Sequence, residues 1–390
     1  MSPEDGADVL VVGDGPVAAS AALIALRGHR RVLWLGGEEQ ASSHSDDPRL
    51  FALAPSSIEL LRRLGVWAEI PPDEVQLYEE MHVFWAEGGR LHFLPPTRRG
   101  MILGAMVPAV SLRRGLERTL AAAGALIRRP RAVLVAREVH AGRISLRAED
   151  GCAFRARVVL DCEGRGGTLA DLAGSPRRLY EPRVRAIVGV VRSSLPHDGI
   201  ARQVFAREGP LGLLPRADGA LGYVWSVSEP LARSLLAMGP EGLAQRLSEA
   251  SAGLLGRLTP EGPPASFPLV IQRRLRLVAP RLVLLGDAAR TVHPFAGQGL
   301  NLGFRDLLAL EPLLKNAPDP GAWVLLRRYE RRRYPEDALA VAGLETLRRL
   351  LSRPDPWGMR ARALDLLDRA ECLKGLFVRL AIGPETSLPP

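Results

Sequence analysis

Residues 282–310 constrain the fold of this chain more than any other segment, because they combine a strand, an acidic turn, a glycine-rich loop and a helix. The apolar run 282–285 is long enough for one buried strand and ends at Gly286 and Asp287. Glycines at such a turn let the backbone approach a ligand closely, and the free N–H groups of a helix start favour negative charge. The segment predicts a site for a planar ligand that becomes anionic, with Asp287 accepting hydrogen bonds from ligand hydroxyls. The alternative is a plain strand–loop–helix turn without a ligand.

A second pattern of this kind lies at the N-terminus. A strand-like stretch, residues 8–12, precedes Gly13, Gly15 and Ala18 in the spacing G-x-G-x-x-A, and an alanine-rich helix follows until Gly28. Gly13 makes the tight turn, Gly15 admits a pyrophosphate, and Ala18 allows close packing of helix on strand. The pattern predicts a dinucleotide-binding unit that starts with the first strand of the chain.

The second strand of this unit departs from the usual pattern. In a dinucleotide site the second strand usually ends in an acid that binds the adenosine ribose, and in this chain that strand is predicted at Val32–Leu35. Here that position is Leu35 or Gly36, and Glu38 and Glu39 lie just beyond it. Either a nearby glutamate substitutes for the acid or the ribose contact is absent.

The glycine-rich segment after Asp287 resembles the second flavin motif of the FAD-dependent aromatic-ring hydroxylases, GD-x(n)-P-x-x-G-x-G-x-N. The matching positions are Gly286, Asp287, Pro294, Gly297, Gly299 and Asn301. The longer string HPFAGQGLNLGFRD is similar to the ubiquinone-biosynthesis hydroxylase branch, and the resemblance covers essentially the whole chain. It implies FAD as the cofactor, with Leu300 also beside it, and Pro294 and Phe295 at the reactive face of the flavin.

The resemblance also implies roles for residues elsewhere in the chain. Arg49 matches an arginine that reaches the flavin region, and the backbone at Val133 aligns with a position near adenine. Glu163 takes the place of an aspartate in the family's middle motif, near the pyrophosphate. Trp225 lies in the region that covers the substrate pocket, although a tryptophan there is more often plain core. Pro108-Ala109 departs from the family's usual Glu-Asn or Gln pair.

The fold that the resemblance implies is α/β. We expect a dinucleotide-binding, Rossmann-like FAD domain with an inserted β-sheet substrate domain and a helical C-terminal tail. The FAD domain is discontinuous and takes residues 1–75, 100–178 and 268–320. The substrate sheet takes residues 76–99 and 179–267, and the tail takes residues 321–390.

The amino-acid composition indicates which classes of partner and which cellular location to expect. The net charge of +9 comes almost entirely from arginine, with Lys315 and Lys374 as the lysines, and no basic stretch is interleaved with aromatics as nucleic-acid binding would need. Three cysteines without CxxC spacing predict neither a disulfide framework nor a metal site, and favour the cytoplasm. The charge run 327–333 is typical of a solvated helix face. The basic, apolar stretch 364–382 favours a peripheral position at the inner membrane surface.

The activity implied by the resemblance is flavin-dependent hydroxylation of an aromatic ring, with a prenylated phenol of ubiquinone or similar quinone biosynthesis as substrate. NAD(P)H or another reductant supplies electrons, and association with a quinone-biosynthesis complex is expected. No side-chain acid or base is assigned. A halogenase or polyprenyl reductase shares the first glycine motif. A tailoring hydroxylase of soluble aromatic metabolites and a flavin-poor scaffold protein also fit the sequence.

Overall fold

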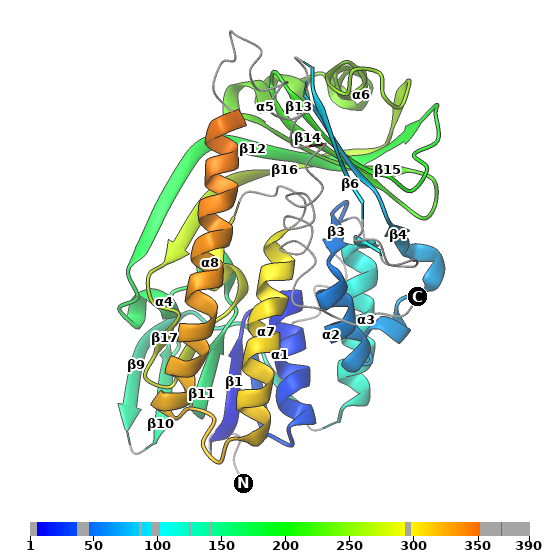
Figure 1. Cartoon of the computed structure of the whole chain (residues 1–390). Coiled ribbons are helices and arrows are strands. Elements are labelled where there is room, and N and C mark those ends of the chain that lie inside the picture. Colours follow the sequence, from blue (N-terminus) through cyan, green and yellow to red (C-terminus); the bar gives the residue numbers. More distant parts are fainter. Residues whose placement is uncertain are drawn as a thin grey trace.

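The structure is a computed structural model of the 390-residue chain and describes residues 6–36, 47–85, 88–94, 102–124, 126–140, 142–292, 298–351 and 368. Within these residues the strands form three sheets (Figure 1). Two have eight strands each, and a small three-stranded sheet belongs to neither. The predicted α/β fold is confirmed.

The first sheet is the dinucleotide-binding sheet, with the order β17-β18-β11-β1-β2-β8 and with β10 and β9 attached through β11. Its strands β18, β11, β1, β2 and β8 run parallel. Its strands are β1 (Ala7–Val12), β2 (Val32–Leu35), β8 (Leu126–Arg129), β9 (Leu134–His140), β10 (Arg143–Ala148), β11 (Ala153–Asp161), β17 (Val278–Ala279) and β18 (Leu282–Leu284). Continuous apolar runs such as Val9–Val12 and β2 are buried on both faces, as parallel strands require.

Two long helices pack together beside this sheet (Figure 1). The first, α1 (Pro16–Arg27), has Pro16 in its first turn and ends at Gly28, as the sequence predicts. It packs against α7 (Gln298–Asn316), where a Cβ at Gly303 would lie 2.6 Å from Val17 Cγ2. The glycine therefore brings the start of α7 close to the start of α1, which places the two predicted glycine motifs side by side.

The second sheet has the order β19-β16-β12-β15-β14-β13-β5-β6. Its strands are β5 (Met81–Trp85), β6 (Arg90–Phe93), β12 (Arg177–Ser193), β13 (Ala201–Ala206), β14 (Gly209–Pro215), β15 (Leu221–Ser228), β16 (Leu258–Arg274) and β19 (Arg290–Thr291). One face is covered by α5 (Glu229–Ala237) and α6 (Gly239–Ala250) (Figure 1). The expected domain limits at 178/179 and 267/268 fall inside β12 and β16, which run from this sheet towards the first one.

The small sheet consists of β3 (Leu50–Leu53), β7 (Gly104–Pro108) and β4 (Gln76–Tyr78). Residues 76–78 therefore pair here and not in the substrate sheet to which we assigned them. The turns η1 (Trp67–Glu69) and η2 (Pro72–Glu74) and the helices α2 (Pro55–Arg63) and α3 (Ala109–Ala122) complete this region. A buried cluster of Ala52, Met106 and Ala201 joins the small sheet to the substrate sheet.

The C-terminal part begins with α8 (Trp323–Leu351), which lies beside α7 (Figure 1). The stretch 364–382, predicted to lie on a membrane, falls outside the described residues apart from Asp368. Its Oδ1 accepts a hydrogen bond from His92 N at the edge strand β6 at 2.9 Å. Among the helices of the described residues, none is long and apolar enough to span a bilayer.

Candidate functional site

The turn after β1 has the geometry of an anion-binding site. Gly13 has φ +129°, and a Cβ there would lie 2.1 Å from the carbonyl oxygen of Cys162, so only glycine fits. Trp34 Nε1 donates a hydrogen bond of 2.7 Å to Gly13 O and fixes the turn from β2. Gly15 precedes α1 with open space beside it, and no side chain caps the helix. The first N–H groups of α1 are therefore available to a pyrophosphate.

The turn after β18 supplies a hydrogen-bond acceptor close to the start of α1. Here η4 (Gly286–Ala288) starts with Gly286 at φ +57°, packed against Val17 of α1. The Asp287 side chain is exposed in a recess whose protein walls raise its pKa by desolvation, against the opposing charges of Arg290 and Arg165. A Cβ at Gly299 would lie 4.0 Å from Asp287 Oδ1. Gly299 thus leaves room beside the carboxylate, as a ligand with hydroxyl groups needs.

The two turns meet because β1, β11 and β18 run parallel and end at one edge of the sheet. Cys162 N donates to Val12 O at 2.7 Å, and Leu285 N donates to Asp161 O at 2.9 Å. Ligands of open α/β sheets bind at the carboxyl ends of the strands. The structure therefore brings Gly13, Gly15, Glu163, Gly286 and Asp287 together at the edge where such a site is expected.

A buried ionic cluster fixes the turn after β18, and the sequence reasoning missed it. Asp306 of α7 accepts hydrogen bonds from Gly286 N at 2.9 Å and from Arg290 Nη1 at 2.7 Å. Arg333 of α8 donates to Asp306 at 2.9 Å and to Asp337 at 2.8 Å, and Asp337 also pairs with Arg290 at 2.7 Å. Arg333 is 1% exposed, so the prediction of a solvated face for the run 327–333 is wrong at this residue.

The electrostatics of this cluster follow from its pairing. Burial opposes ionisation of Asp306, but the charges of Arg290 and Arg333 hold its pKa below the ordinary value. Burial likewise opposes the charge of Arg290, and its two aspartate partners still raise its pKa well above the usual range. Asp306 and the two arginines therefore stay charged together. The sequence signals for this cluster were the FRD tripeptide that ends at Asp306 and the charge run that ends at Arg333.

The middle motif carries two acids with different roles. Glu163 Oε2 accepts hydrogen bonds from Thr168 N at 3.0 Å and Leu169 N at 3.1 Å, at the start of α4 (Leu169–Leu172). Asp161, which we did not predict, is fully buried, and its Oδ1 accepts from Glu163 N at 3.0 Å. Burial, with a contribution from the charge of Glu163, raises the pKa of Asp161 to about 7. The glutamate thus holds a turn of this chain beside the glycine turn, and a direct contact with the cofactor stays a prediction.

The side chain of Asn301 is bound by the protein itself, and the place of this residue at the cofactor stays a prediction. The side chain is 1% exposed. Its Oδ1 accepts from Ala54 N at 2.8 Å and from Ser57 Oγ at 2.7 Å, while Nδ2 donates to Ala52 O at 2.7 Å. These bonds attach the first turn of α7 to the end of β3, so the amide faces protein and not the recess.

Trp225 does not lie at the flavin face. Its side chain is fully buried in the cluster formed by β12, β14 and β15 with α5 and α6. Successive side chains of a strand point to opposite faces, so Tyr223 and Val227 share its face, whereas Val224 and Ser226 point the other way. The assignment of Trp225 to the substrate or flavin face is therefore corrected to a core position.

The remaining residues that were predicted to bind the cofactor range from fully buried to exposed. Arg49 is half-exposed and forms a bidentate pair with Asp47 at 2.7–3.0 Å. Val133 is 60% exposed, and its carbonyl oxygen accepts from Glu149 N at 2.9 Å. Leu300 is half-buried in the first turn of α7 and packs on the main core, and Ala18 is fully buried in α1. Pro294, Phe295 and Gly297 lie outside the described residues.

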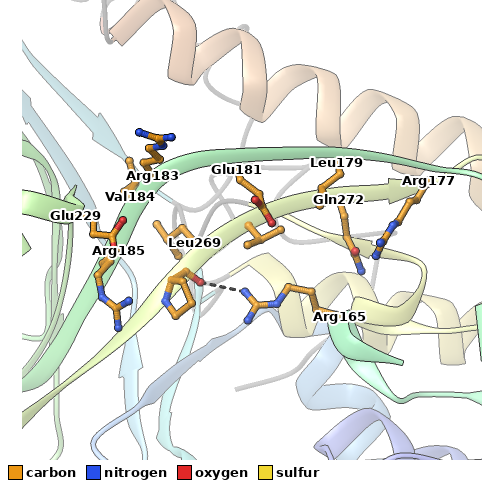
Figure 2. Close-up of a pocket in the computed structure, with 12 residues that line it drawn as sticks. Arg165, Arg177, Leu179, Glu181, Arg183, Val184, Arg185, Glu229, Leu269 and Gln272 are labelled. Atoms are coloured by element: carbon orange, nitrogen blue, oxygen red, sulfur yellow. Dashed lines mark hydrogen bonds between the residues drawn. The ribbon is translucent and has the colours of Figure 1, made fainter. Parts of the chain in front are cut away.

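A pocket of about 440 Å³ lies between the long strands β12 and β16 and the turn η3 (Gly164–Gly166), as Figure 2 shows. Its charged lining is four arginines and two glutamates: Arg165, Arg177, Arg183, Arg185, Glu181 and Glu229. Arg165 donates to Pro268 O at 3.1 Å across the pocket (Figure 2). Gln272, also in the lining, donates to Asp287 O at 3.1 Å. The pocket therefore has an excess of positive charge and touches the acidic turn.

The sheet order, the glycine turn at α1 and the acidic turn at η4 define a dinucleotide-binding flavoprotein. The chain belongs to the family described as FAD binding domain, whose match spans residues 6–342. Ubiquinone hydroxylase UbiL of Rhodospirillum rubrum is 32% identical, over 98% of this chain and 91% of that protein. The 3-demethoxyubiquinol 3-hydroxylase of Escherichia coli is 30% identical, over 96% of this chain and 98% of that protein.

Solved structures agree with the fold. The p-nitrophenol 4-monooxygenase PnpA of Pseudomonas putida aligns over 98% of this chain and 99% of its own, with a TM-score of 0.79 at 19% identity. The expectations of FAD as cofactor and of membership in the FAD-dependent hydroxylase family are confirmed. The open space at Gly15 and the recessed carboxylate of Asp287 fit the pyrophosphate and the hydroxyl groups of that cofactor.

Proposed function

We propose that this protein is an FAD-dependent monooxygenase that hydroxylates the aromatic ring of a prenylated phenol on the route to ubiquinone. The observation that carries the proposal is the meeting of the α1 start and Asp287 at one sheet edge, beside a second sheet large enough to cover a substrate. The names of the two relatives, which match along nearly the whole chain, support the choice of substrate class.

The division of labour is that of a cofactor enzyme. Bound FAD supplies the redox chemistry with dioxygen, and the protein supplies binding, orientation and shielding. The free N–H groups at Gly15 and the following turn hold negative charge, and Asp287 accepts hydrogen bonds from hydroxyls. Asp306 keeps Gly286 in place through its hydrogen bond to the backbone N–H. No Ser-His-Asp set or pair of catalytic carboxylates is required for this chemistry.

We propose NAD(P)H as the electron donor, with its phosphates in the arginine-lined pocket. The excess positive charge of the lining suits a polyanion. Arg165→Ala and Arg177→Ala are each expected to raise KM for NAD(P)H several-fold while FAD affinity stays unchanged. Arg233→Ala, on the exposed side of α5, is the matched control. Unchanged KM in both pocket variants would exclude this pocket as the donor site.

We further propose that the substrate is met at a membrane surface, through the basic apolar stretch 364–382. Deleting residues 364–390 is expected to lower binding to anionic vesicles without loss of flavin. Full-length protein that does not bind such vesicles, and that turns over short soluble phenols as fast as prenylated ones, would favour the tailoring hydroxylase. Association with a quinone-biosynthesis complex remains part of this proposal.

The direct test is turnover with labelled dioxygen. Purified protein with FAD and NAD(P)H is given a prenylated phenol in detergent under ¹⁸O₂, and the product is analysed by mass spectrometry. The proposal predicts one ¹⁸O atom in the new hydroxyl group on the ring of the product, with the other atom of dioxygen reduced to water. Reduced cofactor consumed without labelled product, for prenylated and soluble phenols alike, would contradict it. A protein that takes up no flavin at all would support the scaffold alternative.

A further inference from the structure

The end of β2 lacks the carboxylate that adenosine ribose usually meets in this fold. Leu35 is fully buried, and Gly36 follows it with φ +128°. Gly36 N donates to Arg129 O at 3.0 Å, which ties the strand end to β8. No side chain at either position can therefore reach a ligand, and the acid must come from elsewhere or be missing.

The carboxylate of Asp14 lies next to Gly36, on the side where a side chain of residue 36 would be. A Cβ built on Gly36 would lie 2.4 Å from Asp14 Oδ1 and 2.6 Å from Gly13 O. Position 36 requires glycine because of its φ of +128° and because the backbone of Gly13 also lies where a Cβ would be, and the carboxylate of Asp14, from the turn after β1, lies beside it. A carboxylate is thus present at the end of β2, although β2 does not supply it.

The turn that carries Asp14 is held by contacts on both of its sides, and the carboxylate itself is partly exposed. The Gly13 carbonyl oxygen is fixed by Trp34, and Gly13 packs on the backbone of Cys162. Asp14 is 46% exposed in its side chain and pairs with Arg131 Nη1 at 3.6 Å through Oδ2. It immediately precedes Gly15, where the pyrophosphate site begins, so one turn presents an acceptor and an anion site next to each other.

We infer that Asp14 replaces the missing acid of β2 and accepts hydrogen bonds from the ribose hydroxyls of the adenosine half of FAD. The inference rests on the proposed flavin enzyme and assigns a binding residue that the sequence pattern did not. In the usual arrangement the acid follows β2; here it sits between the two glycines of the first turn. Arg131 pairs with Oδ2 of this carboxylate at 3.6 Å, while Oδ1 lies beside Gly36.

The test uses apoprotein titrated with FAD, followed by flavin fluorescence. Asp14→Ala and Asp14→Asn are expected to weaken FAD binding by about 10- to 100-fold, as for loss of a hydrogen bond to a charged group. Asp8→Asn, on β1 and paired with Arg31 away from the glycine turn, is the matched control and is expected to bind FAD like wild type. Thermal melting of the Asp14 apoproteins is expected to match wild type.

Competition separates the ribose contact from a general charge effect. Wild type is expected to prefer ADP over 2′,3′-dideoxy-ADP by about tenfold or more, and Asp14→Ala is expected to lose this preference. FAD binding and ADP preference unchanged in Asp14→Ala would overturn the inference while leaving the proposed function intact. Loss of the preference in Glu38→Gln or Glu39→Gln, but not in Asp14→Ala, would overturn it as well. Wild-type protein that binds neither FAD nor ADP would overturn both the inference and the proposed function.

Discussion

The two turns of the flavin site are held in different ways. The turn after β18 is fixed from behind by buried charges, because Asp306 binds Gly286 N and is itself held by Arg290 and Arg333. The turn after β1 is fixed by glycine packing and by Trp34, and its charged side chain, Asp14, is half-exposed. We therefore expect substitutions in the buried ionic cluster at the turn after β18 to lower the free energy of unfolding of the whole fold. Substitutions of Asp14 in the turn after β1 are expected to lower mainly the affinity for FAD.

The largest expected effect is that of Asp306→Ala. Removing this carboxylate takes away an anion that two buried arginines, Arg290 and Arg333, share, which typically costs about 3–5 kcal/mol. The free energy of unfolding from a urea titration measures it. Glu336→Ala is the matched control, because Glu336 pairs with Arg333 from an exposed position and its loss is expected to cost less than about 1 kcal/mol. Similar small losses for both variants would show that the cluster does not hold the turn.

Asn301→Ala is expected to have the second-largest effect. It leaves Ala54 N and Ser57 Oγ without their buried acceptor, a loss of about 1–3 kcal/mol in unfolding free energy. Ser57→Ala removes one of these bonds and is expected to cost less. If Asn301 instead contacted the cofactor, the variant would lose FAD affinity with little change in the stability of the apoprotein.

Asp161→Asn tests the buried acid between the two turns through pH. The folded pKa of Asp161, about 7, lies above that of a free aspartate, so the folded protein binds more protons in the window from about 4 to 7. Stability is therefore lost as pH rises, by up to about 1.4 kcal/mol for each pH unit in this window. Unfolding free energies of the apoprotein measured from pH 4.5 to 7.5 are expected to fall more steeply in wild type than in the variant. Parallel curves would show that Asp161 does not titrate there.

Glu163→Asp is expected to have the smallest effect. The shorter side chain no longer reaches both Thr168 N and Leu169 N, which costs about 1 kcal/mol. We expect FAD affinity and the rate of flavin reduction to fall or stay the same, since the turn has adapted to glutamate. A clear gain in either, measured by fluorescence titration and stopped-flow absorbance, would instead mean that the site had decayed.

The fold could be predicted from local sequence patterns. The site could be predicted only in part, because some of its residues make contacts with residues distant in the sequence. The spacing of Gly13, Gly15 and Ala18 predicted β1, its turn and α1, because each signal depends on neighbours in the chain. Arg333 of α8 meets Asp306 of α7 only after the two helices pack, so the charge run 327–333 was interpreted as a solvated face. Trp225 had the right strand but an unpredicted face, which the packing of α5 and α6 decides.

The flavin content of the purified protein tests the central claim most directly. Wild type is expected to show flavin absorbance bands, at purification or after incubation with FAD, and heat is expected to release FAD and not FMN. Asp287→Ala, which removes the acceptor for cofactor hydroxyls from the recess, is expected to bind FAD at least about tenfold more weakly. A wild-type protein without a flavin spectrum even after incubation with excess FAD would contradict the central claim.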